Sequence, residues 1–213
     1  MLKLQTPASL PTPLEHAASN FRWHARSPHR ARCLPVRSQA KLSQLKDIKQ
    51  KITQLAGPKN GLDRSPEQKQ EIEGLIKQVE AKQRSPKKTD LLGTQWHLAY
   101  STSQQSSGGK LGPFIGWVEQ EFPADQPGKY INKLDLGLLK ANLLAEYNYV
   151  ANNKINVKFV DITFSLGPFK INRPFTNSGF WDITYVDDDF RILYTNKSNV
   201  FVMEKIQATR IKS

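Results

Sequence analysis

The chain has a single cysteine, Cys33, among its 213 residues. An intramolecular disulfide is therefore impossible, and no cluster of cysteines can bind a metal ion. The sequence also has no run of about 18 apolar residues, the length that a helix needs to cross a bilayer. We therefore expect no membrane-spanning helix. Histidine is scarce as well: three of the four histidines precede residue 40, which leaves His97 alone in the remainder.

Acidic residues are rare near the N-terminus, and the whole chain carries a formal charge of +12. Residues 1–40 and residues 41–90 each have a net charge of +5, whereas residues 91–213 have only +2. The positive charge is thus concentrated before the main domain, which argues against a basic nucleic-acid groove across that domain. We predict no nucleic-acid partner.

Residues 1–40 combine five prolines, scattered serine and threonine, six basic residues and one acid. This composition, without an apolar core, is typical of an organellar transit peptide and differs from a secretory signal. The proline content favours a plastid address. The alternative is a basic tail that the mature protein keeps.

Residues 41–90 are expected to form a helical segment. Between Ala40 and Ala56, apolar residues recur at spacings of three and four with lysines opposite, which predicts an amphipathic helix. Ser65-Pro66 predicts the start of a second helix, with Ser65 as its cap. Two interpretations stay open together: the helices pack on a neighbouring sheet, and their lysines lie on an anionic lipid surface.

Residues 91–206 are expected to form one β domain, and residues 207–213 a tail. Short β-branched and aromatic runs alternate with Gly, Asn, Asp and Ser breaks, the pattern of consecutive antiparallel strands. The fold class is therefore mainly β. About eight such strands can close into a barrel that holds side chains or a small ligand; a two-sheet sandwich is the competing arrangement. The expected strands are Leu91–Thr102, Phe114–Phe122, Tyr130–Leu136, Ala141–Val150, Ile155–Leu166, Phe180–Val186, Phe190–Thr195 and Val200–Lys205.

Three local features add to this strand pattern. The apolar parity changes within Ile155–Leu166, which predicts a bulge of the kind that bends a strand for barrel closure. Pro168 and Pro174 are expected to frame a connecting segment between strands. The Gly/Ser-rich stretch Gln104–Gly112 is expected to form a flexible flap.

Two motifs at the ends of the β domain resemble those of the plastid lipid-associated proteins, also called plastid fibrillins. The first is Gly93-x-x-Trp96-x-Leu98-x-Tyr100-Ser101-Thr102, preceded by the helical pair. The second is Gly179-x-Trp181-x-x-x-Tyr185-x-Asp187-x-Asp189-x-Arg191-Ile192, followed by Asn199-x-Phe201-Val202. The resemblance extends over about residues 40–206 and assigns no subgroup.

This resemblance implies a lipocalin-like barrel in plastids, at thylakoids, at plastoglobules or in the stroma. Its implied function is non-catalytic binding or structural coating of apolar lipids such as prenylquinones, carotenoids and tocopherols, with peripheral contact to plastid membranes or lipid particles. The resemblance also implies an alternative, an interaction module that supports a prenyl diphosphate synthase or another enzyme of prenyl-lipid synthesis.

Seven aromatic side chains are candidates for the wall of an apolar cavity, because large aromatics suit a site for greasy ligands. For each of them the alternative is a place in the packed core. The candidates are Tyr100, Trp117, Tyr147, Tyr149, Phe164, Trp181 and Tyr185.

Trp96 and Arg191 are predicted to form a structural lock. Barrel closure would bring their strands together, so that the guanidinium stacks on the indole. Lipocalins close their barrels with a comparable pair, which supports this reading by analogy. The alternative places Arg191 at the surface.

No catalytic residue, metal site or cofactor is predicted. Asp187-Asp188-Asp189 fits a hairpin turn better than a cation site, because three consecutive carboxylates do not converge on one ion without an ordered loop. The sequence contains no nucleophile elbow, phosphate loop or metal-spaced His/Cys set. One alternative stays open, a carboxylate pair in the cavity, because acids fall on candidate strands. They are Glu119, Glu121, Asp135 and Glu146.

Overall fold

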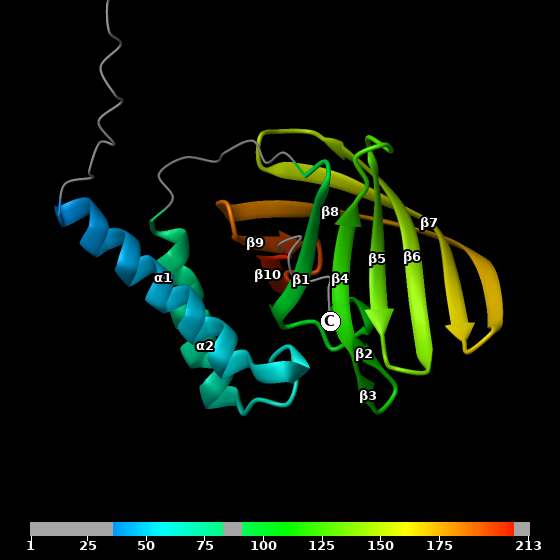
Figure 1. Ribbon diagram of the computed structural model, residues 1–213, viewed down its shortest axis with the longest axis horizontal. Helices are drawn as coiled ribbons and strands as arrows, with labels where there is room; N and C mark the ends of the chain where they lie inside the picture. Colours follow the sequence, from blue (N-terminus) through cyan, green and yellow to red (C-terminus); the bar gives the residue numbers. More distant parts are fainter. Residues whose placement is uncertain (1–35, 83–90, 207–213) are drawn as a thin grey trace, which may run out of the picture. The chain divides into compact units, whose positions relative to one another are not determined.

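The structure is a computed structural model that describes residues 36–82 and 91–206 (Figure 1). The expected leader, apart from the start of the first helix, and the expected tail 207–213 lie outside the described residues. Two helices come first, α1 (Val36–Ala56) and α2 (Pro66–Glu80), with the 3-10 turn η1 (Gly57–Lys59) after α1. No helix in this part of the chain is long and apolar enough to cross a membrane.

Eight antiparallel strands close into a barrel, as the sequence predicts. Their order around the barrel is β1-β10-β9-β8-β7-β6-β5-β4, and β1 pairs with β4 to close it. The barrel strands are β1 (Thr94–Ser101), β4 (Trp117–Phe122), β5 (Lys129–Asp135), β6 (Leu139–Tyr149), β7 (Lys154–Leu166), β8 (Phe169–Val186), β9 (Phe190–Thr195) and β10 (Val200–Lys205). The short strands β2 (Lys110–Leu111) and β3 (Phe114–Ile115) form a separate hairpin, and the 3-10 turn η2 (Ser106–Gly108) precedes it.

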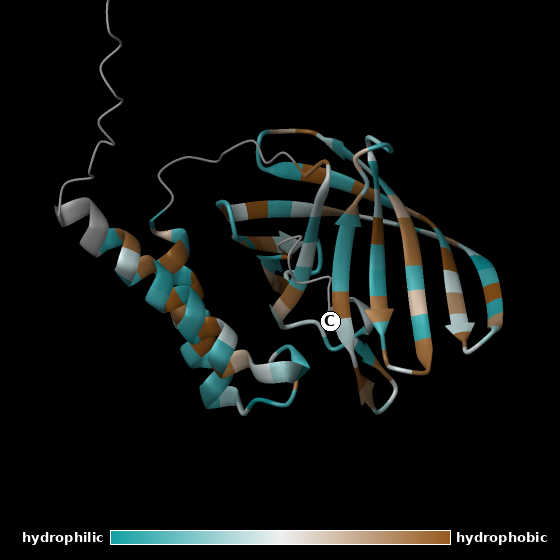
Figure 2. Ribbon diagram, in the orientation of Figure 1, coloured by the Kyte–Doolittle hydropathy of each residue, from teal (hydrophilic) through white to brown (hydrophobic). Residues whose placement is uncertain are grey.

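Hydrophobic residues alternate with polar ones along the strands (Figure 2), and this alternation separates two apolar cores. The first core lies inside the barrel and includes Trp96, Phe122, Tyr130, Trp181 and Met203. The second core lies between the barrel and the helices. It joins residues of α1 and α2 to outward residues of β1, β8, β9 and β10. The interpretation that the helices pack on the sheet is thus confirmed.

The start of α2 agrees with the sequence, whereas α1 begins earlier than expected. α2 starts with Ser65 as its N-cap, as predicted, and a capping box joins Ser65 and Gln68 reciprocally. Its buried stripe consists of Ile72, Leu75, Ile76 and Val79, the spacing of one helix face. The backbone of α1 is helical from Val36, four residues before the expected start.

The segment from Pro168 to Pro174 is not the connection that the sequence suggests, because most of it belongs to the 18-residue strand β8. Proline lacks the N–H that a sheet ladder needs, so it is confined to edges and bulges. Pro174 lies opposite Asp161, where the β7–β8 register shifts. Here the extra residue belongs to β8, between Pro174 and Asn177, and this bulge makes room for the proline. The bulge predicted within Ile155–Leu166 is confirmed by the pairing of β7 with β6, where Leu144 and Ala145 lie opposite Asp161 and Phe159.

Candidate functional site

The barrel contains a cavity of about 260 Å³. Its inner wall is largely apolar and is contributed by β4, β5, β6, β7, β8, β9 and β10. The apolar and aromatic lining residues are Tyr130, Leu143, Val157, Phe159, Phe175, Phe180, Trp181, Leu193 and Phe201. The polar lining residues are Gln105, Ser106, Ser107, Gln120, Asn132, Asn177, Ser178, Thr195, Asn196, Lys197 and Asn199.

Most of the polar lining belongs to one end of the barrel. The loop 105–107, the β9–β10 turn and residues 177–178 of β8 all lie there, so this end forms the mouth. The stretch expected to be a flap includes the loop 105–107. Asn60 anchors the stretch by donating to the Gly108 carbonyl at 3.1 Å, and it also donates to the Gly116 carbonyl, beyond the stretch, at 3.2 Å. Gln120 and Asn132 are the polar exceptions deeper inside.

The cavity volume limits what fits inside. Sites for drug-sized ligands typically measure about 300–1,000 Å³, so 260 Å³ accommodates a ring or a short chain segment. A longer lipid would have to continue through the mouth. None of the lining residues is His, Cys, Asp or Glu.

Trp181 is the candidate that lines the cavity. Tyr147, Tyr149 and Phe164 also pack against the barrel core, and the two tyrosines take part in a chain of ring contacts. Tyr147 contacts Phe122 edge-on at 5.5 Å and Tyr149 at 5.9 Å, measured between ring centroids. These three residues support the wall and are absent from its inner surface.

Tyr100 and Tyr185 are corrected from cavity residues to residues of the outer core. Both lie beneath the helices, where their side chains are almost fully buried. A bulge explains each case. In β1 the register shifts between Leu98 and Tyr100, and in β8 it shifts between Ile183 and Tyr185. One extra residue reverses the inward–outward alternation, so each tyrosine turns out of the barrel.

Trp117 is also corrected, because it lies on the outside with half of its surface exposed. Its ring stacks on His97 with centroids 3.3 Å apart, and its indole N–H donates to Glu119 at 2.7 Å. Burial lowers the pKa of His97 to about 4, although the hydrogen bond to the Val118 carbonyl opposes this shift. His97 is therefore neutral at physiological pH.

Arg191 lies over Trp96 inside the barrel, at 4.6 Å from its guanidinium carbon to the ring centroid. The rings of Phe122 and Trp181 are 5.6 and 5.9 Å away. The side chain has no solvent exposure, and burial lowers the pKa of Arg191 to about 9. The alternative of a surface arginine is thus wrong, while a role in locking the barrel stays a prediction.

The deeper polar residues were missed by sequence reasoning. Arg191 Nη2 donates to Gln120 Oε1 at 2.6 Å. Arg191 Nε and Nη1 and Asn132 Oδ1 are buried without a hydrogen-bond partner in the described part of the chain. A signal was present: Gln120 falls at an inward position between Val118 and Phe122, where a strand facing a core normally carries apolar residues.

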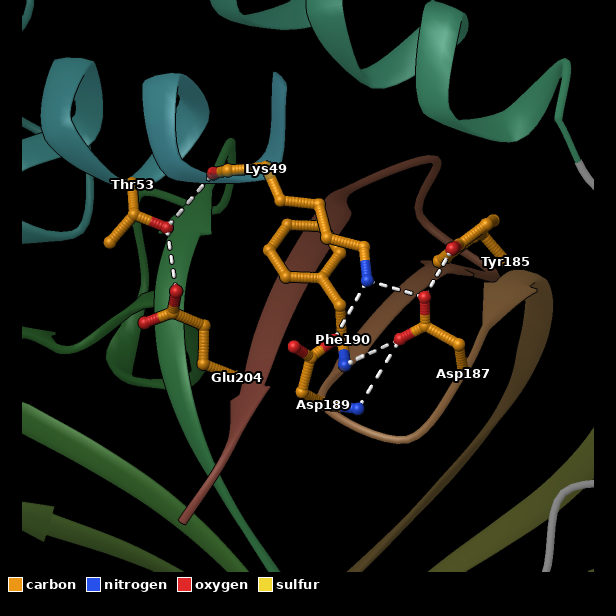
Figure 3. A network of polar contacts seen from close by, with 7 residues as sticks. All are labelled: Lys49, Thr53, Tyr185, Asp187, Asp189, Phe190 and Glu204. Carbon is orange, nitrogen blue, oxygen red and sulfur yellow. Dashed lines mark hydrogen bonds and ion pairs between the residues drawn. The ribbon is translucent and has the colours of Figure 1, made fainter. Parts of the chain in front are cut away.

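Asp187-Asp188-Asp189 forms the expected hairpin turn, and the turn also contacts α1 through Lys49 (Figure 3). Asp187 Oδ1 accepts from the backbone N–H groups of Asp189 and Phe190, as in a hairpin turn. Asp187 Oδ2 accepts from Tyr185 and from Lys49 of α1, and Lys49 also pairs with Asp189 at 2.7 Å. Burial favours the neutral acid, yet the hydrogen bonds from Lys49 and Tyr185 lower the pKa of Asp187 overall. The turn therefore attaches α1 to the barrel.

The possible carboxylate pair does not form in the cavity. Glu119 bonds Trp117 outside, while Glu121 pairs with Lys133. The other two acids also belong to the outer surface: Asp135 pairs with Lys140 at 2.8 Å, and Glu146 is exposed. Within the described residues, no group of three or more His, Cys, Asp or Glu side chains is placed to hold a metal ion.

An exposed apolar face continues from the cavity mouth. Residues 169–180 of β8, which we call the β8 extension, pair with β7 and have no partner in β9 (Figure 1). Phe169 and Ile171 lie opposite Leu166 and Phe164. Phe169, Ile171 and Leu166 are 74%, 55% and 55% exposed. Leu138, in the adjacent β5–β6 turn, is 81% exposed.

Comparisons with known proteins give one match. The family model PAP_fibrillin matches residues 46–164, more than half of the chain. This span covers about half of α1, all of α2, and the chain from β1 to most of β7, and it ends before the second of the two motifs. No curated protein and no solved structure matches the chain significantly.

Proposed function

Because the chain belongs to the plastid fibrillin family, PAP_fibrillin, we propose that its barrel binds one apolar plastid lipid without converting it chemically. The candidate ligands are prenylquinones, carotenoids and tocopherols. The observation that carries the proposal is the cavity, which is lined by aromatic side chains and opens at one end of a closed barrel. Sites for small ligands have this character, an apolar wall with few polar groups inside.

Tryptophan fluorescence of the full-length protein tests this binding. Trp181 lines the cavity, whereas Trp117 is on the outer surface. We expect plastoquinone, α-tocopherol or β-carotene to quench the emission. Trp181→Phe should remove most of the quenching, and Trp117→Phe, the matched control, should keep it. Absence of quenching by all three lipids, beside a lipid-binding protein that responds, would overturn the proposal.

We further propose that the open end of the barrel rests on a lipid surface, at thylakoids or plastoglobules. The β8 extension and Leu138 expose apolar side chains there. Such a surface is unfavourable in water and marks an interaction site. Lys170 lies on the opposite face of the extension, and lysines near an anionic lipid surface each add about 1 kcal/mol of attraction.

Flotation with vesicles of anionic plastid lipids tests the contact. Leu166→Ser should reduce the bound fraction. Val150→Ser is the matched control, because Val150 has the same 55% exposure but lies in the β6–β7 turn at the other end of the barrel. Equal binding by the two variants and the parent would refute the placement.

The N-terminal residues 1–40 are the candidate transit peptide for a plastid location. We propose that residues 1–40 direct import and are removed, in keeping with the plastid association of the family and with the basic, proline-containing composition. Sequencing the N-terminus of protein isolated from tissue would test this, and an intact Met1 would contradict it.

A further inference from the structure

Two amides face each other in the wall of the cavity. Gln120 of β4 lies directly opposite Asn132 of β5, and both side chains line the cavity. Their neighbours on the inner face, Val118, Phe122 and Leu134, belong to the apolar core. A polar group in such surroundings is costly unless it is hydrogen-bonded. Each of the two amides therefore needs hydrogen-bond partners.

Arg191 determines which end of the Gln120 amide faces the cavity. A guanidinium group only donates hydrogen bonds, so the atom at 2.6 Å from Nη2 is the amide oxygen. The Gln120 NH₂ group remains to donate on the cavity side. Because Arg191 is held among three aromatic rings, this orientation is fixed.

Asn132 presents the opposite polarity. Its Oδ1 is buried and accepts no hydrogen bond from the described residues. Buried acceptors without a donor are rare in native proteins, and each exception calls for an explanation such as a bound molecule. The atom can accept a hydrogen bond from a ligand that reaches the wall.

The cavity thus offers one donor and one acceptor on neighbouring strands. Directly opposite residues in an antiparallel pair have Cβ atoms about 4.5–5.5 Å apart, so one ligand oxygen can reach both amides. A hydroxyl group satisfies both, because it accepts from Gln120 and donates to Asn132. A carbonyl or an ether oxygen only accepts, and would leave Asn132 Oδ1 unpaired.

We propose that Gln120 and Asn132 recognise the hydroxyl head group of a lipid, a phenol or an alcohol, which enters the barrel first. This inference rests on the proposed lipid-binding function. The cavity volume suits a ring, and the apolar tail then leaves through the mouth past Phe159 and Phe175, whose ring centroids are 6.0 Å apart. The pair selects reduced, hydroxyl-bearing ring lipids over their oxidised or etherified counterparts.

The test compares α-tocopherol with α-tocopherol methyl ether, which lacks the donating hydroxyl. Affinities are measured by fluorescence quenching of the full-length protein. We expect the ether to bind at least about tenfold more weakly, because it leaves a buried acceptor unpaired. Equal affinities would overturn the inference and leave the lipid-binding function standing. Absence of binding by both probes would overturn the two together.

Two variants separate recognition from folding. Asn132→Leu should bring the affinities of the two probes within about twofold, through weaker binding of α-tocopherol. Asn142→Leu is the matched control, since Asn142 is exposed on β6, and it should keep the parent preference. Without ligand, Asn132→Leu should unfold at the same temperature as the parent or higher, because leucine removes an unpaired buried oxygen. An unchanged preference in Asn132→Leu, or a lower unfolding temperature, would contradict the assignment.

Discussion

Replacing Arg191 by lysine tests the proposed lock of the barrel. Lysine keeps an amino group that can donate in the core but loses the planar group that stacks on Trp96 at 4.6 Å. Cation–π stacking in a desolvated site contributes about 2 kcal/mol, and the hydrogen bond from the charged group to Gln120 about 1.5–3 kcal/mol. Lysine retains a fraction of both. We therefore expect the free energy of unfolding to fall by about 2–4 kcal/mol.

This loss is measurable by urea denaturation and by thermal unfolding followed by circular dichroism. At roughly 2–4 °C per kcal/mol for a chain of this size, the unfolding temperature should fall by about 5–15 °C. Arg191→Ala should lose a similar amount, because it also leaves Gln120 Oε1 without its donor. Arg173→Lys, at an exposed arginine of β8, is the control. If Arg191→Lys and Arg191→Ala both unfold like the parent, the pair does not lock the barrel.

Three further predictions concern the helix contacts, the pH dependence and one glycine. Lys49→Met should lower the free energy of unfolding by about 1–2 kcal/mol, because it leaves the half-buried Asp187 without its cation; Lys41→Met, at an exposed lysine of α1, should change little in the same urea titration. Burial lowers the pKa of His97 from 6.5 to about 4. Between these pH values the unfolded chain binds a proton at His97 that the folded chain does not. The free energy of unfolding should therefore fall as the pH is lowered from 6.5 to 4. His97→Gln should flatten that decline in urea titrations at several pH values, and an identical pH profile would refute the assignment. Gly61→Ala should destabilise the protein more than Gly137→Ala: both glycines have positive φ, but a Cβ on Gly61 would lie 2.3 Å from the Tyr100 ring and one on Gly137 would meet nothing within 4 Å. Equal unfolding temperatures for the two alanine variants would contradict this packing.

The strand pattern was readable from sequence because most barrel strands are short and keep their alternation. The bounds of Phe190–Thr195 and Val200–Lys205 agree with β9 and β10 residue for residue. Strand β8 was harder, because Pro174 normally excludes a strand and the bulge that accommodates it depends on β7. Its first half was therefore missed.

The cavity was less predictable than the barrel. Counting alternate residues places Tyr100 on the face of Trp96, and the bulge that reverses this placement is set by the register with β10. The residue type does not distinguish the two placements either, because a tyrosine suits both the core inside the barrel and the core beneath the helices. The ion pairs of Lys49 with Asp187 and Asp189 join residues about 140 positions apart, a separation at which no sequence spacing is informative.

The bulges in β1 and β8 make the length of these strands as important as their composition. Each strand serves the cavity before its bulge and the helices after it, and Ala99 and Thr184 are the extra residues that switch the face. Straightening either bulge without losing a residue would turn Tyr100 or Tyr185 into the barrel. Deleting Ala99 or Thr184 would instead leave each tyrosine facing the helices, because the residues on either side of the deleted one already pair with consecutive residues of β10 or β9. Related sequences should therefore tolerate a one-residue deletion at these two positions better than elsewhere in β1 or β8, where it would move side chains to the other face. A bulge that moved by one position would exchange a residue between the cavity and the helix contact without any change in the fold.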